Sequence, residues 1–169
     1  MICPTIVQSW RVVGQIIGGY LELDPAFDSA PTPGKVNARA LVSVPVRTLN
    51  SGKSEMDNVM LEAMKQKNHP KIEYHLTEMV LKEAPKTPDA PLQFDTKGEL
   101  VVAGVTNKIT MPVTMERIEK TKLKFKGSTP IKMTDYGVTP PVKFGVFRTG
   151  NEIKIIFEWM TVHRIEKAK

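Results

Sequence analysis

Residues 99–118 read ELVVAGVTNKITMPVTMERI, and this stretch decides what kind of fold the chain can adopt. Its second half alternates between an apolar set, Ile109, Met111, Val113 and Met115, and a more polar set, Thr110, Pro112, Thr114 and Glu116. Alternation with a period of two is the pattern of a β-strand with one apolar face. The stretch holds no nucleophile, base or metal-ligand cluster, so the question is what this apolar face contacts.

Further stretches follow the same alternation, at 40–48, 71–77 and 152–163, and KTKLKFK at 120–126 has the pattern of a half-exposed strand. Strands with one apolar and one polar face are typical of antiparallel sheets. Pro45 and Pro112 fall on polar-facing positions and lack an N–H donor, so we expect an edge, a bulge or a break in pairing at both. Turn-forming residues separate the strands at 31–35, 51–54, 83–91, 105–108, 139–141 and 148–152.

One stretch, SEMDNVMLEAMKQKNHP at 54–70, has helical spacing instead. It predicts one α-helix over about 55–66, which Pro70 ends. The helix carries a stripe of methionines, Met56, Met60 and Met64. Methionine adapts to irregular partners, so the stripe either plugs the core or contacts a ligand.

These patterns predict a mainly β chain with one helix. The strands are expected to form one antiparallel sheet of about eight strands that closes into a barrel, since a sheet with one apolar face must close on itself or be covered. The 169 residues, 41% hydrophobic and 25% charged, fit a single globular domain over 1–169.

Charge and hydropathy exclude several classes of protein. The net charge is +6, but the lysines are dispersed and lack the arginine-rich, aromatic pattern of a nucleic-acid interface. They form a solvated basic face or attract anionic head groups. No apolar run is long enough for a transmembrane helix. The first residues, MICPTIVQSWRVVG, show no signal peptide. The single cysteine, Cys3, is an inert thiol or, if a signal peptide precedes it, a lipid-anchor site.

Candidate reactive groups are few. His69, His75 and His163 show no metal-ligand spacing and are expected on the surface. Asp57, three residues after Ser54, fits a capping box, and Asp135 fits a turn. No nucleophile elbow or phosphate-binding glycine loop occurs, so the sequence predicts neither a catalytic residue nor a metal site and favours binding over catalysis.

Taken in order, five segments resemble the YceI-like family of bacterial cell-envelope proteins. They are VNARALVSVPVRTLNSGKSEMDNVMLEAM (36–64), NHPKIEYHLT (68–77), GELVVAGVTNKITMPVTM (98–115), FKGSTPIKMTDYGV (125–138) and GNEIKIIFEW (150–159). The resemblance spans about 10–162. Only nine residues precede Trp10, and Gln8-Ser9 stand where the family often has a histidine, so we expect a shortened first strand.

The resemblance implies a lipocalin-like antiparallel barrel that is not an enzyme and needs no cofactor beyond a bound polyisoprenoid or isoprenoid quinone. It implies a periplasmic protein whose partner is this apolar lipid. The chain is expected to be a monomer or homodimer and to bind no nucleic acid. The side chains expected to contact the lipid are Val42, Val44, Val46, Met56, Met60, Met64, Ile72, Tyr74, Leu100, Val102, Ile109, Met111, Val113, Met115, Phe125, Ile131, Met133, Tyr136, Ile155, Phe157 and Trp159. Two alternatives remain open. One is a solid barrel whose basic loops bind a partner or act in envelope stress; the other is a hydrolase or isomerase acting on an apolar substrate.

Overall fold

A computed structural model describes residues 2–4, 9–14, 16–24, 32–52, 54–87, 90–119, 122–138, 142–143, 147–148 and 152–162. For 2–4, 9–11, 142–143 and 147–148 it describes the backbone alone. Gln8, His163 and the turn predicted at 139–141 lie outside the described residues, as do the side chains of Cys3 and Trp10.

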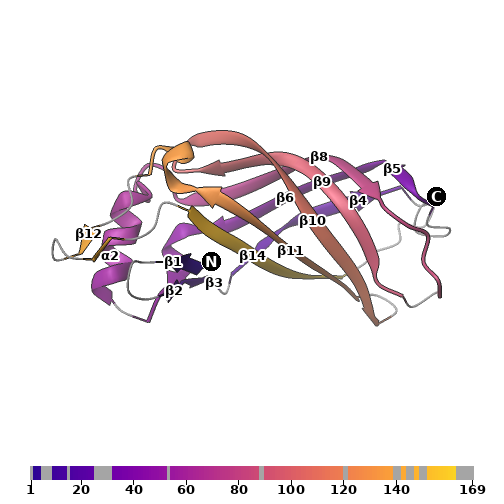
Figure 1. The fold of residues 1–169 in the computed structure, drawn as a ribbon, viewed down its shortest axis with the longest axis horizontal. Helices are drawn as coiled ribbons and strands as arrows, with labels where there is room; N and C mark the ends of the chain where they lie inside the picture. The colour runs from indigo at the N-terminus through magenta and orange to yellow at the C-terminus, as the bar shows by residue number, and fades with distance from the viewer. Residues whose placement is uncertain are drawn as a thin grey trace.

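The described chain is mainly β, as the sequence predicts (Figure 1). The strands are β1 (Ile2–Pro4), β2 (Ser9–Arg11), β3 (Val13–Gly14), β4 (Gly18–Leu23), β5 (Gly34–Val36), β6 (Ala38–Pro45), β7 (Leu49–Asn50), β8 (Lys71–Leu81), β9 (Leu92–Val102), β10 (Val105–Glu119), β11 (Lys122–Lys132), β12 (Val142–Lys143), β13 (Phe147–Arg148) and β14 (Glu152–Val162). Two 3-10 helices, η1 (Val46–Thr48) and η2 (Met133–Tyr136), and the α-helix α2 (Ser54–Ala63) complete the described elements.

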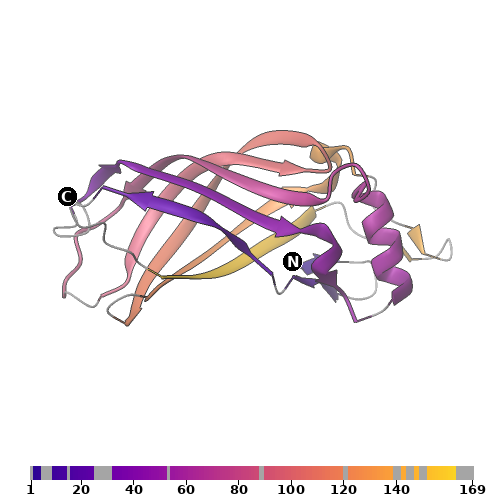
Figure 2. The ribbon, with the colours of Figure 1, turned by 180° about the vertical axis from the view of Figure 1, so that it is seen from behind.

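The main sheet has ten strands in the order β2-β1-β14-β11-β10-β9-β8-β6-β4, with β5 pairing to β8. Every pairing in it is antiparallel. The sheet curls into a half-barrel, since no ladder between described residues joins β4 to β14 (Figures 1 and 2). The strand number exceeds the predicted eight because the N-terminal segment is divided into short strands.

The helix α2 lies across one end of the half-barrel, and β5 lies at the other (Figure 1). The helix α2 ends earlier than predicted because Lys65 adopts the left-handed conformation, with φ of 54°. The amide of Gln66 then donates to Leu61 O, and that of Lys65 donates to Glu62 O, which is a Schellman motif. Asp57 does not act as predicted with Ser54, which is already helical. Its carboxylate accepts hydrogen bonds from the Ser51 amide and hydroxyl, at 2.8 and 2.6 Å.

Both prolines stand where pairing stops, as predicted. Pro45 is the last residue of β6 and leads into η1. At Pro112 the strand β10 keeps its partner Asp95 on β9, but its ladder with β11 begins only at Val113↔Gly127. The turn between β9 and β10 is Ala103-Gly104, with φ of 50° and 81°. The turn predicted at 105–108 is therefore wrong, and these residues belong to β10.

Inward-facing side chains form two core clusters. The helix-end cluster comprises Val12, Val46, Leu49, Met64, Leu100, Val102, Ala103, Ile131, Met133, Tyr136, Val138 and Ile153. The far-end cluster comprises Val36, Met79, Leu81, Leu92, Phe94, Met111, Val113, Met115, Leu123, Phe125 and Trp159. The alternating strands thus bury their apolar faces against one another at both ends of the half-barrel.

Candidate functional site: an apolar cavity between two core clusters

The inner side of the sheet holds an apolar cavity of about 180 Å³. Its walls come from the N-terminal segment, β6, β7 and the strands β8 to β11 and β14. The residues that line it are Val12, Gly14, Ile17, Val42, Val44, Leu49, Ile72, Tyr74, Leu100, Ile109, Met111, Thr129, Ile155, Ile156, Phe157 and Glu158. These residues include members of both clusters, so the cavity occupies the stretch where the packed ends of the half-barrel meet.

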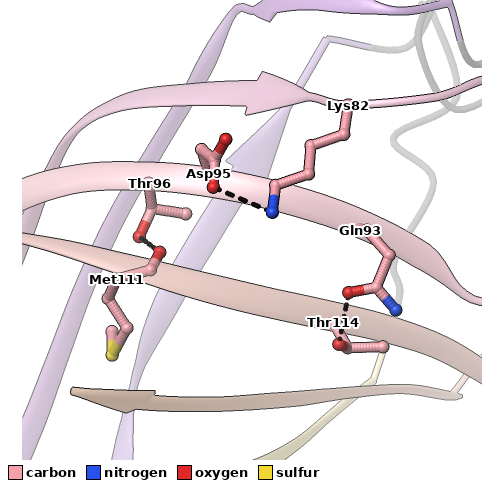
Figure 3. A network of polar contacts seen from close by, with 6 residues as sticks. All are labelled: Lys82, Gln93, Asp95, Thr96, Met111 and Thr114. Carbon is pink, nitrogen blue, oxygen red and sulfur yellow. Dashed lines mark hydrogen bonds and ion pairs between the residues drawn. The ribbon is translucent and has the colours of Figure 1, made fainter.

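Tyr74 on β8 stands at this junction and packs against both clusters. Its hydroxyl lies 3.1 Å from Thr96 Oγ1. The Thr96 hydroxyl in turn donates to Met111 O at 2.8 Å (Figure 3). Because a threonine hydroxyl has one hydrogen, Tyr74 must be the donor in its bond to Thr96. The polar tip of Tyr74 is thereby satisfied within the wall.

This arrangement makes the Tyr74 hydroxyl sensitive to alkali. Burial raises the pKa of Tyr74 above its ordinary value of about 10, because the phenolate would be poorly solvated there. The folded state therefore retains the proton that the unfolded chain releases. The resulting stability is complete below pH 10 and is lost as the pH rises through the raised pKa.

We expect Tyr74→Phe to lower the free energy of unfolding by about 1 kcal/mol at neutral pH, since one buried hydrogen bond is lost. Urea unfolding at pH values from neutral to above 10 measures this. The difference between the two proteins should shrink as the pH rises, because only the parent loses the contribution of Tyr74. A constant difference across this range would mean that Tyr74 ionises as an exposed phenol.

Few polar side chains border the cavity. Thr129 on β11 is buried, and its hydroxyl donates to Thr110 O at 3.3 Å. Glu158 on β14 is the single charged residue among the described lining residues, and its carboxylate lies 3.0 Å from Lys124 Nζ. The rest of the lining is hydrocarbon or glycine apart from the Tyr74 hydroxyl. Such a lining can hold an apolar group, but it offers little polar recognition.

The family model of the YceI-like domain matches residues 8–160. The chain belongs to the YceI-like family. The resemblance drawn from the sequence is thereby confirmed. No curated protein matches the chain.

Solved structures share this YceI-like fold. A polyisoprenoid-binding domain from Saccharophagus degradans, implicated in plant cell wall breakdown, has a TM-score of 0.69 at 11% identity, over 96% of this chain and 91% of its own. Burkholderia cenocepacia BcnA has a TM-score of 0.67 at 17% identity, over 89% and 87%. The Campylobacter jejuni YCEI protein has a TM-score of 0.67 at 15% identity, over 92% and 85%. At these identities the likeness concerns the fold alone.

Some of the residues that the sequence predicts as lipid contacts line the cavity, and others do not. Those that line the cavity are Val42, Val44, Ile72, Tyr74, Leu100, Ile109, Met111, Ile155 and Phe157. Those buried in the clusters away from it are Val46, Met64, Val102, Ile131, Met133 and Tyr136 at the helix end and Val113, Met115, Phe125 and Trp159 at the far end. Met60 packs against the helix-end cluster, and Met56 is half-buried.

Several cavity residues were missed by the sequence analysis. They are Val12, Gly14, Ile17, Leu49, Thr129, Ile156 and Glu158. The first four lie in short strands or bends, where alternation gives no signal. Ile156 and Glu158 occupy outward-facing positions in the alternation of β14, so the sequence pattern assigns them to the solvent face.

The other candidate reactive groups lie elsewhere. His75 Nε2 is 3.1 Å from Glu73 Oε2 on β8. Asp135 is exposed, and its carbonyl accepts a hydrogen bond from Asn107 Nδ2 at 2.7 Å. Tyr136 is buried, and its hydroxyl has no hydrogen-bond partner among the described residues. None of these three residues lines the cavity, and neither does His69.

The described part of the chain lacks two further kinds of feature. It contains no group of three or more His, Cys, Asp or Glu side chains placed to hold a metal ion. It also contains no helix that is long and apolar enough to cross a membrane.

Proposed function

We propose that this chain is a single-domain, non-enzymatic binder of a long-chain apolar lipid, a polyisoprenoid or isoprenoid quinone, in the bacterial periplasm. The observation that carries the proposal is the apolar cavity between the two clusters. Membership of the YceI-like family and the fold shared with a polyisoprenoid-binding domain support it. The protein would store or transport the lipid as a monomer or homodimer.

The cavity lining suits such a ligand energetically. Each buried methylene group contributes roughly 0.8 kcal/mol, so one five-carbon isoprene unit contributes about 3–4 kcal/mol before ordering costs. A branched chain also needs a conformable wall. Met111 and the β-branched Val44, Ile72 and Ile109 provide aliphatic surfaces without a competing polar group.

Filling the cavity should abolish this binding. Val44 is half-buried on β6 and lines the cavity, so Val44→Trp would place an indole inside it. Protein purified from cells is expected to yield an apolar molecule in an organic extract by mass spectrometry, and Val44→Trp to yield little of it.

The matched control is Thr106→Trp, at an exposed position of β10. It adds a tryptophan of the same size outside the cavity and should leave the extracted lipid unchanged. Circular dichroism establishes that both variants retain the sheet. Parent protein that carries no extractable lipid and takes up none from vesicles would contradict the proposed function.

The alternatives find less support in the same region. An interaction module would need free basic side chains. In the basic stretch of β11, Lys122 and Lys124 lie 3.5 and 3.0 Å from the carboxylates of Glu119 and Glu158, and Lys126 is exposed. A hydrolase or isomerase would need a polar cluster at the cavity. The described lining offers Thr129 and Glu158, and the Tyr74 hydroxyl is already bonded to Thr96.

A further inference from the structure

The cavity reaches the edge of β14 that has no ladder partner there among the described residues. Ile156, Phe157 and Glu158 are consecutive in this strand, and all three line the cavity. Successive side chains of a strand point to opposite faces of the sheet. The cavity therefore extends past the inward-facing Phe157 to the backbone or edge of β14 at the outward-facing Ile156 and Glu158. Gly14 and Ile17 of the N-terminal segment also line it.

This edge borders a longer gap in the sheet, which we call the seam: the space between the edges of β4 and β14. Within the described residues β4 pairs only with β6. The strand β14 pairs along its length with β11, and among the described residues its other edge meets β1 only at Ile2↔Lys154. In Figure 2, β4 (violet) and β14 (gold) are the two strands that border the seam. Within the described residues, no strand pairing therefore closes this side of the half-barrel.

Large apolar side chains are exposed along the β14 margin of the seam. Ile156, Met160 and Val162 are 51%, 50% and 64% exposed, and all three side chains belong to the outward-facing set of β14. Glu158 lies between Ile156 and Met160 on this face, but its ion pair with Lys124 is formed with the neighbouring strand β11, away from the free edge. An apolar strip therefore continues from the cavity along the outer face of β14.

The cavity alone is too small for a long chain. A protein cavity of about 150 Å³ holds one benzene molecule, six carbon atoms. At about 180 Å³ this cavity has room for little more than one five-carbon isoprene unit. The remaining units of a longer chain need another apolar surface that is continuous with the cavity. From Ile156 to Val162 the outer face of β14 extends over about 20 Å, at roughly 3.3 Å per residue.

We propose that the seam is a lateral lipid-binding subsite: an isoprenoid chain enters the half-barrel sideways between β4 and β14, with its end in the cavity and the rest against Ile156, Met160 and Val162. This inference rests on the proposed function, because it takes an isoprenoid chain as the ligand. It adds the route of entry and three contact residues that neither the alternation of the sequence nor the family match indicates.

The test measures whether a bound chain covers position 160, which belongs to the strip but does not line the cavity. In a Cys3→Ser background, which removes the single cysteine, Met160→Cys places one thiol on the strip. Its rate of alkylation by a maleimide is compared in free protein, with isoprenol (one isoprene unit) and with geranylgeraniol (four units). Equilibrium dialysis establishes that each alcohol is bound. Thr106→Cys in the same background is the control, at an exposed position of β10.

Geranylgeraniol at about ten times its Kd should slow alkylation at position 160 about tenfold, because only the small unloaded fraction reacts. Isoprenol, which fits within the cavity, should leave this rate unchanged, and neither alcohol should change the rate at position 106. If geranylgeraniol binds and position 160 still reacts at the free rate, or if isoprenol protects equally, the seam proposal is wrong and the proposed function stands. If neither alcohol binds to the parent protein, both proposals fail. Should Met160→Cys not fold, Val162→Cys on the same strip provides the equivalent measurement.

Discussion

Replacing Phe94 by alanine is expected to lower the free energy of unfolding by about 3–5 kcal/mol, the usual cost of removing a fully buried phenylalanine ring. Phe94 on β9 is 0% exposed and belongs to the far-end cluster. Its backbone pairs with Leu81 of β8 and Val113 of β10, both buried, so the surroundings leave little room to collapse into the void. Chemical denaturation at equilibrium measures the change, and the slope with denaturant tests whether unfolding remains two-state.

The matched control is Phe157→Ala. This removes the same ring from β14, but Phe157 is half-buried and faces a cavity that already exists. The loss of burial is smaller, and no new enclosed void of the same size is created. We therefore expect a clearly smaller cost for Phe157→Ala. Equal costs at the two positions would contradict the distinction between a packed far end and a hollow middle.

Much of the sheet follows from local patterns, and its errors have local causes. Alternation identified the core of β6, β8, β10 and β14. The alternation predicted β8 only as far as residue 77, because the register with β9 shifts between Leu76 and Glu78. Before this bulge the inward-facing residues are Tyr74 and Leu76, and after it they are Met79 and Leu81. The β9–β10 turn was misplaced since its first residue, Ala103, has no turn signature and its positive φ is set by the hairpin.

The cavity was less predictable than the sheet. The alternation of a strand shows which face of the sheet a side chain occupies, but it does not show whether other side chains fill the space in front of that face. Ile109 and Val113 share one face of β10, yet Ile109 lines the cavity and Val113 is buried in the far-end cluster. This difference depends on which strands curl over each position, and it is a property of the assembled sheet. The contact of Ile156 with the cavity was unpredictable for the same reason, since alternation places this residue on the outer face of β14.

Gly98→Ala is expected to cost about 3 kcal/mol, the upper end of the usual range for overpacking. Gly98 on β9 is buried and lies diagonally across from Tyr74, so the tyrosine ring packs directly over it. A Cβ at this position would lie 2.6 Å from both His75 O and Tyr74 Cζ. The ring can rotate away, but the carbonyl belongs to the β8 backbone and moves only if the ladder is distorted. Removing the ring as well, in Tyr74→Ala/Gly98→Ala, should therefore restore little stability.

Gly127 provides the comparison that isolates this argument. The three atoms nearest to a Cβ there all belong to the flexible side chain of Phe157. Gly127→Ala should accordingly cost less than Gly98→Ala, and Phe157→Leu in the same chain should rescue it, with a coupling of at least about 0.5 kcal/mol in a double-mutant cycle. Because Phe157 lines the cavity, the displaced ring should also reduce lipid uptake by Gly127→Ala. Tyr74→Ala could instead restore the stability of Gly98→Ala as fully as Phe157→Leu restores that of Gly127→Ala. In that case the ring of Tyr74, and not the backbone carbonyl of His75, would be the reason for glycine at position 98.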